Sequence, residues 1–165
     1  MFSQATGIIE FTVHSIQAPL SVSVLCGATF ENLTPGLTYE TIAIDDGSTA
    51  NIVRFNGSET FNPAQIEIEG APYSQVIVNF SLPRRLYSTQ NDMGFVRMDY
   101  DQQSASIYDY KSGNYIFFNP EAGTTLTLPG DGQRALIYLG GNPQVTPFAE
   151  IGEFVGIGIV IIEYS

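Results

Sequence analysis

Short runs of alternating apolar and polar residues fill this chain, and helical periodicity is almost absent. Residues 75–82, QVIVNFSL, place Val76, Val78 and Phe80 on one face of an extended segment. A period of two is typical of a half-buried β-strand. Clusters of Gly, Pro, Asn and Asp separate the runs, as turns require. The pattern predicts an all-β sandwich or barrel with strands near residues 7–16, 19–25, 37–44, 50–55, 64–69, 74–82, 94–100, 105–110, 114–118, 124–128, 134–139 and 153–164.

The last segment, GEFVGIGIVIIEYS, is apolar on both faces of the expected strand. A strand of this kind lies inside a layered body or is covered by another chain. Because no helix is predicted to cover it, we expect a second copy of the chain to do so. Glycine within a strand often marks the close approach of a large side chain. The acceptor residues expected on one face are Phe154, Gly156, Gly158, Val160 and Ile162.

The first 18 residues, MFSQATGIIEFTVHSIQA, form a candidate arm that precedes a β-sandwich domain at 19–165. Such an arm could pair with its own sheet or complete the sheet of a neighbouring subunit. Fully extended, it would reach about 60 Å, enough to cross to a second copy. The residues expected to make the contact are Ile8, Ile9, Phe11, Val13 and Ile16.

Composition favours one folded domain and argues against two classes of partner. The chain has 165 residues and a formal net charge of -11, which repels nucleic acid and anionic lipid. No apolar run approaches the length of a membrane-spanning helix. Cys26 is the single cysteine, so no intrachain disulfide can form, and we expect its side chain to be buried.

Sequence signals for catalysis are weak. His14 is the single histidine, and no nucleophile motif accompanies it. The spacing D-x-D-x-D-G of a calcium loop is absent, and no glycine-rich phosphate loop precedes a helix. We therefore expect no enzymatic activity, no cofactor and no metal.

Residues 95–118 combine tyrosines with Asp, Gln, Ser and Asn. Aromatic rings beside hydroxyl and amide groups can bind sugars, and they can equally form cross-strand pairs that stabilise a sheet. Strand alternation favours the structural interpretation. The candidate ligand or adhesion residues are Tyr100, Tyr108, Tyr110 and Tyr115.

From Pro19 onward the order of segments resembles a known family. The segments VIVNFSLP, GTTLTLPGDGQRALIYLGGNPQV and GEFVGIGIVIIEYS carry the resemblance, with landmarks at Pro35-Gly36 and Gly140-Gly141. The family consists of secreted bacterial β-sandwich proteins of unknown function and is itself similar to pilin and fimbrial subunits. The resemblance implies an immunoglobulin-like, pilin-like sandwich at the cell surface, with its signal peptide removed.

The leading functional expectation is a structural subunit of an extracellular filament. Each subunit would donate its N-terminal strand to the sheet of the next, in a head-to-tail homopolymer. Surface glycans or other fibres are further possible partners. The alternatives are a carbohydrate-binding adhesive module that uses the tyrosines, and a virion structural protein with the same sandwich.

Overall fold

The protein is all-β. Its computed structural model describes residues 4–15, 19–45, 51–90, 94–130, 134–150 and 152–165. These residues contain no α-helix, and hence no helix that could span a membrane. They form the strands β1 (Ala5–Ser15), β2 (Ser21–Cys26), β3 (Ala28–Leu33), β4 (Thr60–Asn62), β5 (Ala64–Glu69), β6 (Gln75–Ser81), β7 (Arg85–Ser88), β8 (Phe95–Asp99), β9 (Ala105–Asp109), β10 (Asn114–Phe118), β11 (Thr124–Thr127), β12 (Ala135–Leu139), β13 (Asn142–Val145) and β14 (Gly152–Tyr164).

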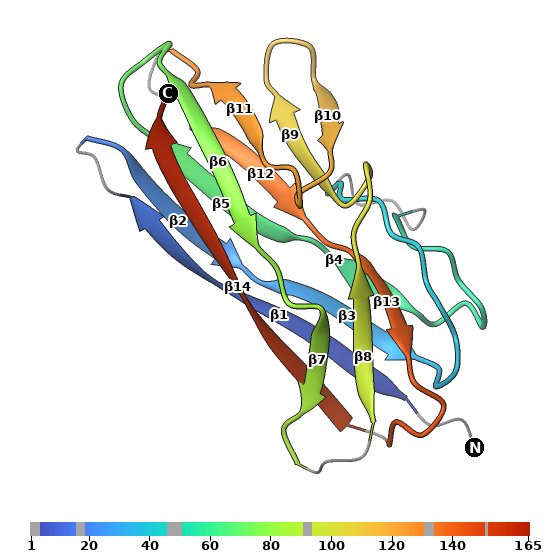
Figure 1. Cartoon of the computed structure of the whole chain (residues 1–165). Coiled ribbons are helices and arrows are strands. Elements are labelled where there is room, and N and C mark those ends of the chain that lie inside the picture. The colour runs from blue at the N-terminus through green and yellow to red at the C-terminus, as the bar shows by residue number, and fades with distance from the viewer. Residues whose placement is uncertain (1–3, 16–18, 46–50, 91–93, 131–133, 151) are drawn as a thin grey trace.

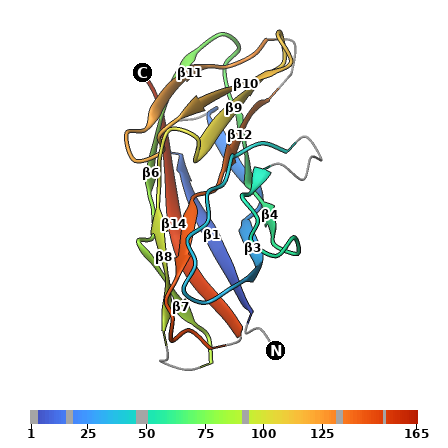
Figure 2. The ribbon, with the colours of Figure 1, turned by 90° about the vertical axis from the view of Figure 1, so that its right-hand side faces the viewer.

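The strands belong to two sheets in a sandwich-like arrangement (Figures 1 and 2). The larger sheet has the order β13-β8-β7-β14-β1-β3-β4, and β6 joins it by pairing with both β14 and β11. The smaller sheet has the order β10-β9-β12-β5-β2. Both sheets supply fully buried side chains to one core, among them Phe30 and Val160 from the larger and Ile66 and Ile137 from the smaller. The two sheets are therefore parts of one folded body.

Three short breaks let the chain cross from one sheet to the other. Gly27 separates β2 from β3, Pro63 separates β4 from β5, and Gly140 and Gly141 separate β12 from β13. A Cβ atom on Gly27 would lie 2.5 Å from the carbonyl oxygen of Ile9, so this crossing passes too close to β1 for any side chain. Strands that change sheets in this way form the corners of a sandwich.

Two predicted strands, 37–44 and 50–55, are wrong. Tyr39, Thr41 and Ala43 are buried, so their alternation is real. Within the described residues, however, the two segments form isolated bridges, Thr38–Gln144 and Thr41–Ile52, with a few further backbone hydrogen bonds, and no continuous strand. The alternation here arises because every second side chain of a loop is buried, and not because the segment belongs to a continuous strand. The prediction also missed β3, β4, β7 and β13, which are short or contain residues that disfavour strands.

Cys26 was expected to be buried and is exposed. The pairing of β2 with β5 shifts register between Val24 and Cys26, and this irregularity leaves both Leu25 and Cys26 exposed to solvent. The Cys26 thiol donates a long hydrogen bond of 3.7 Å to the carbonyl oxygen of Pro63.

Candidate functional site

Strand β1 lies in a groove between β14 and β3 of its own chain. It pairs in parallel with β14 from Ala5–Gly152 to Ser15–Ile162, and antiparallel with β3. The expected arm therefore folds back here onto its own sheet. Ile16, also expected in the arm, lies outside the described residues.

Large side chains of β1 and β7 fill the gaps left by two glycines of β14. A Cβ atom on Gly158 would lie 2.5 Å from the Phe11 ring, and one on Gly156 would lie 2.6 Å from the Leu86 side chain. The prediction that these glycines make room for large side chains is confirmed. Ile9 is fully buried, and the half-buried Phe11 and Val13 pack against the core beside it. The acceptor residues Phe154, Val160 and Ile162 are buried in the same core.

The outer face of β14 remains partly open. The side chains of Ile157 and Ile161 are 62% and 41% exposed, whereas Val155 and Ile159 are half-buried. Pairing with β1 satisfies the edge of β14 but cannot cover a face, because paired strands lie side by side in one layer. The expectation that one donated strand would both pair with β14 and cover its second apolar face was therefore wrong.

Three of the four candidate tyrosines gather on the β9–β10 hairpin. Tyr108 lies opposite Tyr115 across the two strands, with ring centroids 5.3 Å apart. Tyr110 packs edge-on against Tyr108 at 5.0 Å, and Tyr115 contacts Tyr138 of β12 at 5.7 Å. Edge-on and tilted aromatic pairs of this kind stabilise a sheet. The cross-strand ring pairs of the structural interpretation are therefore present, and the ligand role stays a prediction.

Burial changes the ionisation of this tyrosine cluster. It raises the pKa of Tyr138 to about 12, with a smaller contribution from the neighbouring Tyr115. Burial also raises the pKa of Tyr110, and the nearby Glu67 carboxylate adds to the effect. Tyr100 lies outside the cluster: it is buried, and its hydroxyl donates a 2.6 Å hydrogen bond to the Pro83 carbonyl oxygen.

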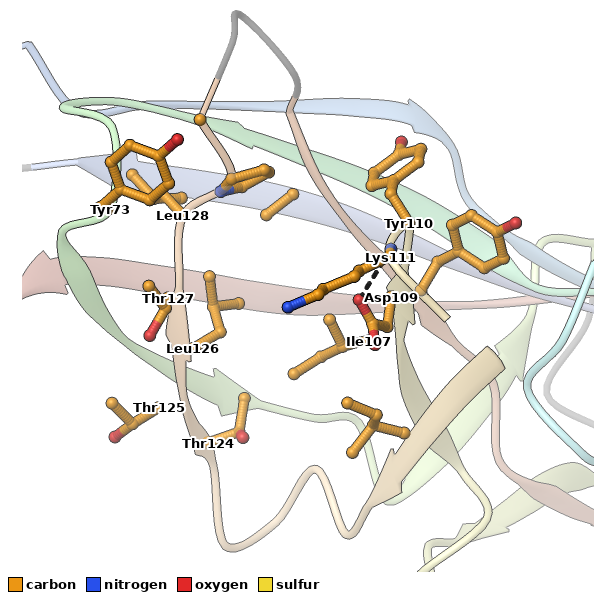
Figure 3. Close-up of a pocket in the computed structure, with 15 residues that line it drawn as sticks. Tyr73, Ile107, Asp109, Tyr110, Lys111, Thr124, Thr125, Leu126, Thr127 and Leu128 are labelled. Atoms are coloured by element: carbon orange, nitrogen blue, oxygen red, sulfur yellow. Dashed lines mark hydrogen bonds between the residues drawn. The ribbon is translucent and has the colours of Figure 1, made fainter. Parts of the chain in front are cut away.

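A cleft of about 700 Å³ opens between β11 and β9, and Tyr108 and Tyr110 of the tyrosine cluster are among its lining residues (Figure 3). Its apolar lining includes Ile107 and Ile116 on one side and Leu126 on the other. Lys111 extends its side chain into the cleft, whereas the Tyr110 ring lies away from its centre (Figure 3). The cleft has the size of a ligand site and combines apolar walls with a few polar groups.

Asp109 stands beside Lys111 but is held by its own hairpin. Its carboxylate accepts hydrogen bonds from the Ser112 hydroxyl at 2.7 Å and from the Lys111 backbone N–H at 3.0 Å. These bonds lower the pKa of Asp109. No salt bridge joins Lys111 to a carboxylate within the described ranges.

Glu59 is a buried carboxylate with a structural role. It accepts hydrogen bonds from the backbone N–H groups of Phe55, Asn56 and Gly57, at 2.9 to 3.3 Å. Burial acts to raise its pKa, but these hydrogen bonds together outweigh burial and hold the pKa below its ordinary value. Glu59 thus organises the loop that precedes β4.

Sequence reasoning found the tyrosine hairpin and the β1–β14 residues but missed the cleft. The cleft brings together β9, β10 and β11, whose positions follow from sheet topology and not from local pattern. The alternation of TTLTL at 124–128 was the one available signal, since it predicts a strand with threonines on its outer face. The chain matches no family model, and no curated protein matches it.

Proposed function

We propose that the protein is a structural subunit of an extracellular filament that donates β1 to the sheet of the next copy. The supporting observation is the place of β1. It is the first strand of the chain, yet it lies inside the larger sheet, between β14 and β3. Removing β1 would leave both neighbours with an unpaired edge, and unpaired edges invite pairing with another chain.

The direction of the donated strand follows from the short connection to β2. Residues 16–20 can span at most about 20 Å, so an exchanged β1 would end close to the start of the donor's β2. In Figure 1 the end of β1 and the start of β2 lie at the same end of the body. A strand donated parallel to β14 would therefore join like ends of two molecules, which closes a pair. A strand donated antiparallel to β14 would join opposite ends, and such head-to-tail contacts extend into a filament.

The sequence of β1 suits both directions. Its inward residues Ile9, Phe11 and Val13 alternate evenly about Phe11. Reversing the strand about Phe11 keeps that ring over Gly158. Ile9 then lies opposite Val160, and Val13 lies opposite Gly156. Phe11 fills the slot at Gly158 in both directions, so the folded-back strand and the donated strand compete for one groove.

Burial makes a lasting joint physically reasonable. A fully buried aliphatic or aromatic side chain contributes about 1.5–3 kcal/mol, and Ile9, Phe11 and Val13 would share one interface. Backbone hydrogen bonds to both β14 and β3 would add to this. The immunoglobulin-like, pilin-like form of the sandwich and a location at the cell surface belong to the same proposal.

Deletion of residues 1–17 tests the proposal. The truncated protein should remain soluble and fail to form filaments, and a synthetic peptide of residues 1–17 should bind it with a stoichiometry of one. A matched peptide with Phe11→Asp should not bind, because the groove would then bury a charge. Filaments of unchanged repeat from the truncated protein, seen by electron microscopy, would show that the joint lies elsewhere.

A second candidate, carbohydrate binding, is favoured by the contiguous rings of Tyr108, Tyr110 and Tyr115. Tyr110 is 43% exposed and offers a ring to a sugar. A glycan titration in which Tyr110→Ala abolishes binding by a monomeric protein would support this role. Tyr87→Ala, at an exposed tyrosine of β7, is the matched control.

A further inference from the structure

Strand β11 has one open edge. Strand β11 pairs with β6 on one side, and no strand of the described residues pairs with its other side. The Leu128 N–H donates to the Ser74 carbonyl oxygen, and the Leu128 carbonyl accepts from the Tyr73 N–H, so both of its backbone groups point toward the β6 side. Backbone direction alternates along an antiparallel strand, which turns the N–H and C=O groups of Thr125 and Thr127 toward the open edge.

The apolar groups beside this edge are incompletely covered. Ile116 of β10 is 55% exposed, and the neighbouring Ile107 of β9 is half-buried. Both line the cleft that runs along Thr124–Leu128 (Figure 3). At this end of the molecule the smaller sheet therefore extends beyond the cover that the larger sheet provides. A further strand beside β11 would supply the missing cover and satisfy the open backbone groups at once.

Lys111 indicates the charge of the occupant. Its side chain reaches into the cleft from the β9–β10 turn, and Asp109, the nearest acidic residue in sequence, is bound instead by Ser112 and by the Lys111 backbone (Figure 3). Among the described residues, Lys111 is the one cation in the cleft lining. The Asp109 carboxylate, which also lines the cleft, already accepts hydrogen bonds within its own hairpin, so a ligand carboxylate would complement the Lys111 ammonium group. The unpaired backbone groups of β11 favour a peptide, because an extended peptide can bond to a row of N–H and C=O groups.

We propose that this cleft binds an extended peptide segment by β-augmentation at β11. The peptide has apolar side chains at alternate positions, which cover Ile107 and Ile116, and an acidic residue that meets Lys111. Four residues of β11 offer an edge of about 13 Å, which matches a short segment of four or five residues. This site is distinct from the groove that holds β1, so the proposal does not depend on filament formation.

The test uses the full-length protein and blocked seven-residue peptides with valine at alternate positions. One peptide carries a central glutamate and its matched control carries glutamine. Amide resonances report binding, and the amides of Thr125 and Thr127 should shift and gain protection from hydrogen exchange. The glutamate peptide should bind about threefold more tightly than the glutamine peptide, the scale of an exposed ion pair.

Two variants distinguish β-augmentation from other binding. Thr125→Pro removes an open-edge N–H without removing a bond to β6, and an edge strand tolerates proline at such a position. It should lower peptide affinity at least tenfold while the thermal unfolding midpoint stays near that of the wild type. Lys111→Gln should abolish the preference for glutamate, and Arg134→Gln, outside the cleft lining, should not.

Three results would overturn the proposal: no shift at Thr125 and Thr127 at millimolar peptide, affinity unchanged by Thr125→Pro, or an equal preference for glutamate in Lys111→Gln. A titration with oligouronate provides the comparison with acidic sugars. Binding of oligouronate that Thr125→Pro leaves intact, without peptide binding, would assign the cleft to saccharides instead.

Discussion

Replacing Gly158 with alanine should destabilise the protein by forcing Phe11 out of its slot. The new Cβ atom would lie 2.5 and 2.7 Å from two carbon atoms of the Phe11 ring, far inside normal contact distance. Phe11 lies directly opposite Gly158 in the parallel ladder of β1 with β14, so the ring can escape the new methyl group only by changing its rotamer or by shifting the strand. Overpacking of this kind costs about 1–3 kcal/mol.

The double variant Gly158→Ala with Phe11→Ala measures the contact itself. Phe→Ala in a core costs about 3–5 kcal/mol, and because Phe11 is half-buried we expect about 2 kcal/mol here. Once the ring is gone, the alanine at 158 meets no clash. The double variant should therefore lose at least about 1 kcal/mol less than the sum of the single variants.

Gly156→Ala is the matched control, because its Cβ atom would meet Leu86 and Pro83 and not Phe11. It should also destabilise the protein, but its effect should add to that of Phe11→Ala. Urea unfolding followed by fluorescence or circular dichroism gives each free energy of unfolding. If Gly158→Ala and Phe11→Ala add to within about 0.5 kcal/mol, the ring does not occupy this slot and the account of the groove is wrong.

Three further predictions concern single side chains. Glu59→Gln should cost about 2 kcal/mol at neutral pH, since hydrogen bonds to a charged group are lost. Because the pKa of Glu59 is lowered on folding, the wild type is more stable than the variant above about pH 4.3, and this difference in stability is lost as pH falls through the folded pKa. Thermal unfolding of both proteins across pH 2–7 measures the difference, and a difference that stays constant with pH would contradict the prediction. Tyr138→Phe should remove a tyrosine that ionises near pH 12 in ultraviolet titration, and an unchanged titration curve would refute the assignment. Because folding raises the pKa of Tyr138, its contribution to the stability of the wild type is complete below about pH 10 and is lost as pH rises through 12. Cys26 should react with an aromatic disulfide reagent in the native state at the rate of a small thiol; reaction limited by unfolding would show that it is buried.

The alternation of apolar and polar residues predicted most of the strands, because each of these strands buries the side chains on one of its two faces. It succeeded for β5, β6 and β14, whose patterns are regular. It failed at 37–44, where buried residues alternate without a ladder, and at β13, where Pro143 disfavours a strand. β13 is the last named strand of the larger sheet, and the Pro143 carbonyl points away from β8 toward the Tyr39 N–H, so the proline nitrogen also points away from β8 and no ladder bond to β8 is lost. This position is a property of the assembled sheet.

The site was predictable only where its residues are close in sequence. The Tyr108–Tyr115 pair follows from hairpin geometry, and the slot at Gly158 follows from glycine in an apolar strand. That Phe11 fills this slot required pairing across nearly the whole chain, which no local pattern specifies. The open edge of β11 likewise exists because no other described strand of the larger sheet extends beside it.

The most direct test of the filament proposal is a disulfide between Ile8→Cys and Ile161→Cys in a Cys26→Ser background. In the folded-back protein Ile8 lies opposite Val155, so Ile161 is six residues, or about 20 Å, further along β14 and out of reach. In a strand donated antiparallel with Phe11 over Gly158, Ile8 lies opposite Ile161 of the next copy.

Oxidation of assembled protein should then give a ladder of covalent oligomers on a non-reducing gel. The matched pair Ile8→Cys with Thr29→Cys, opposite each other in β1 and β3 of one chain, reports the folded-back strand. A ladder from the Ile8–Ile161 pair is the result that the account predicts. Monomers alone from that pair, with complete intrachain linkage of the Ile8–Thr29 pair under the same conditions, would contradict it.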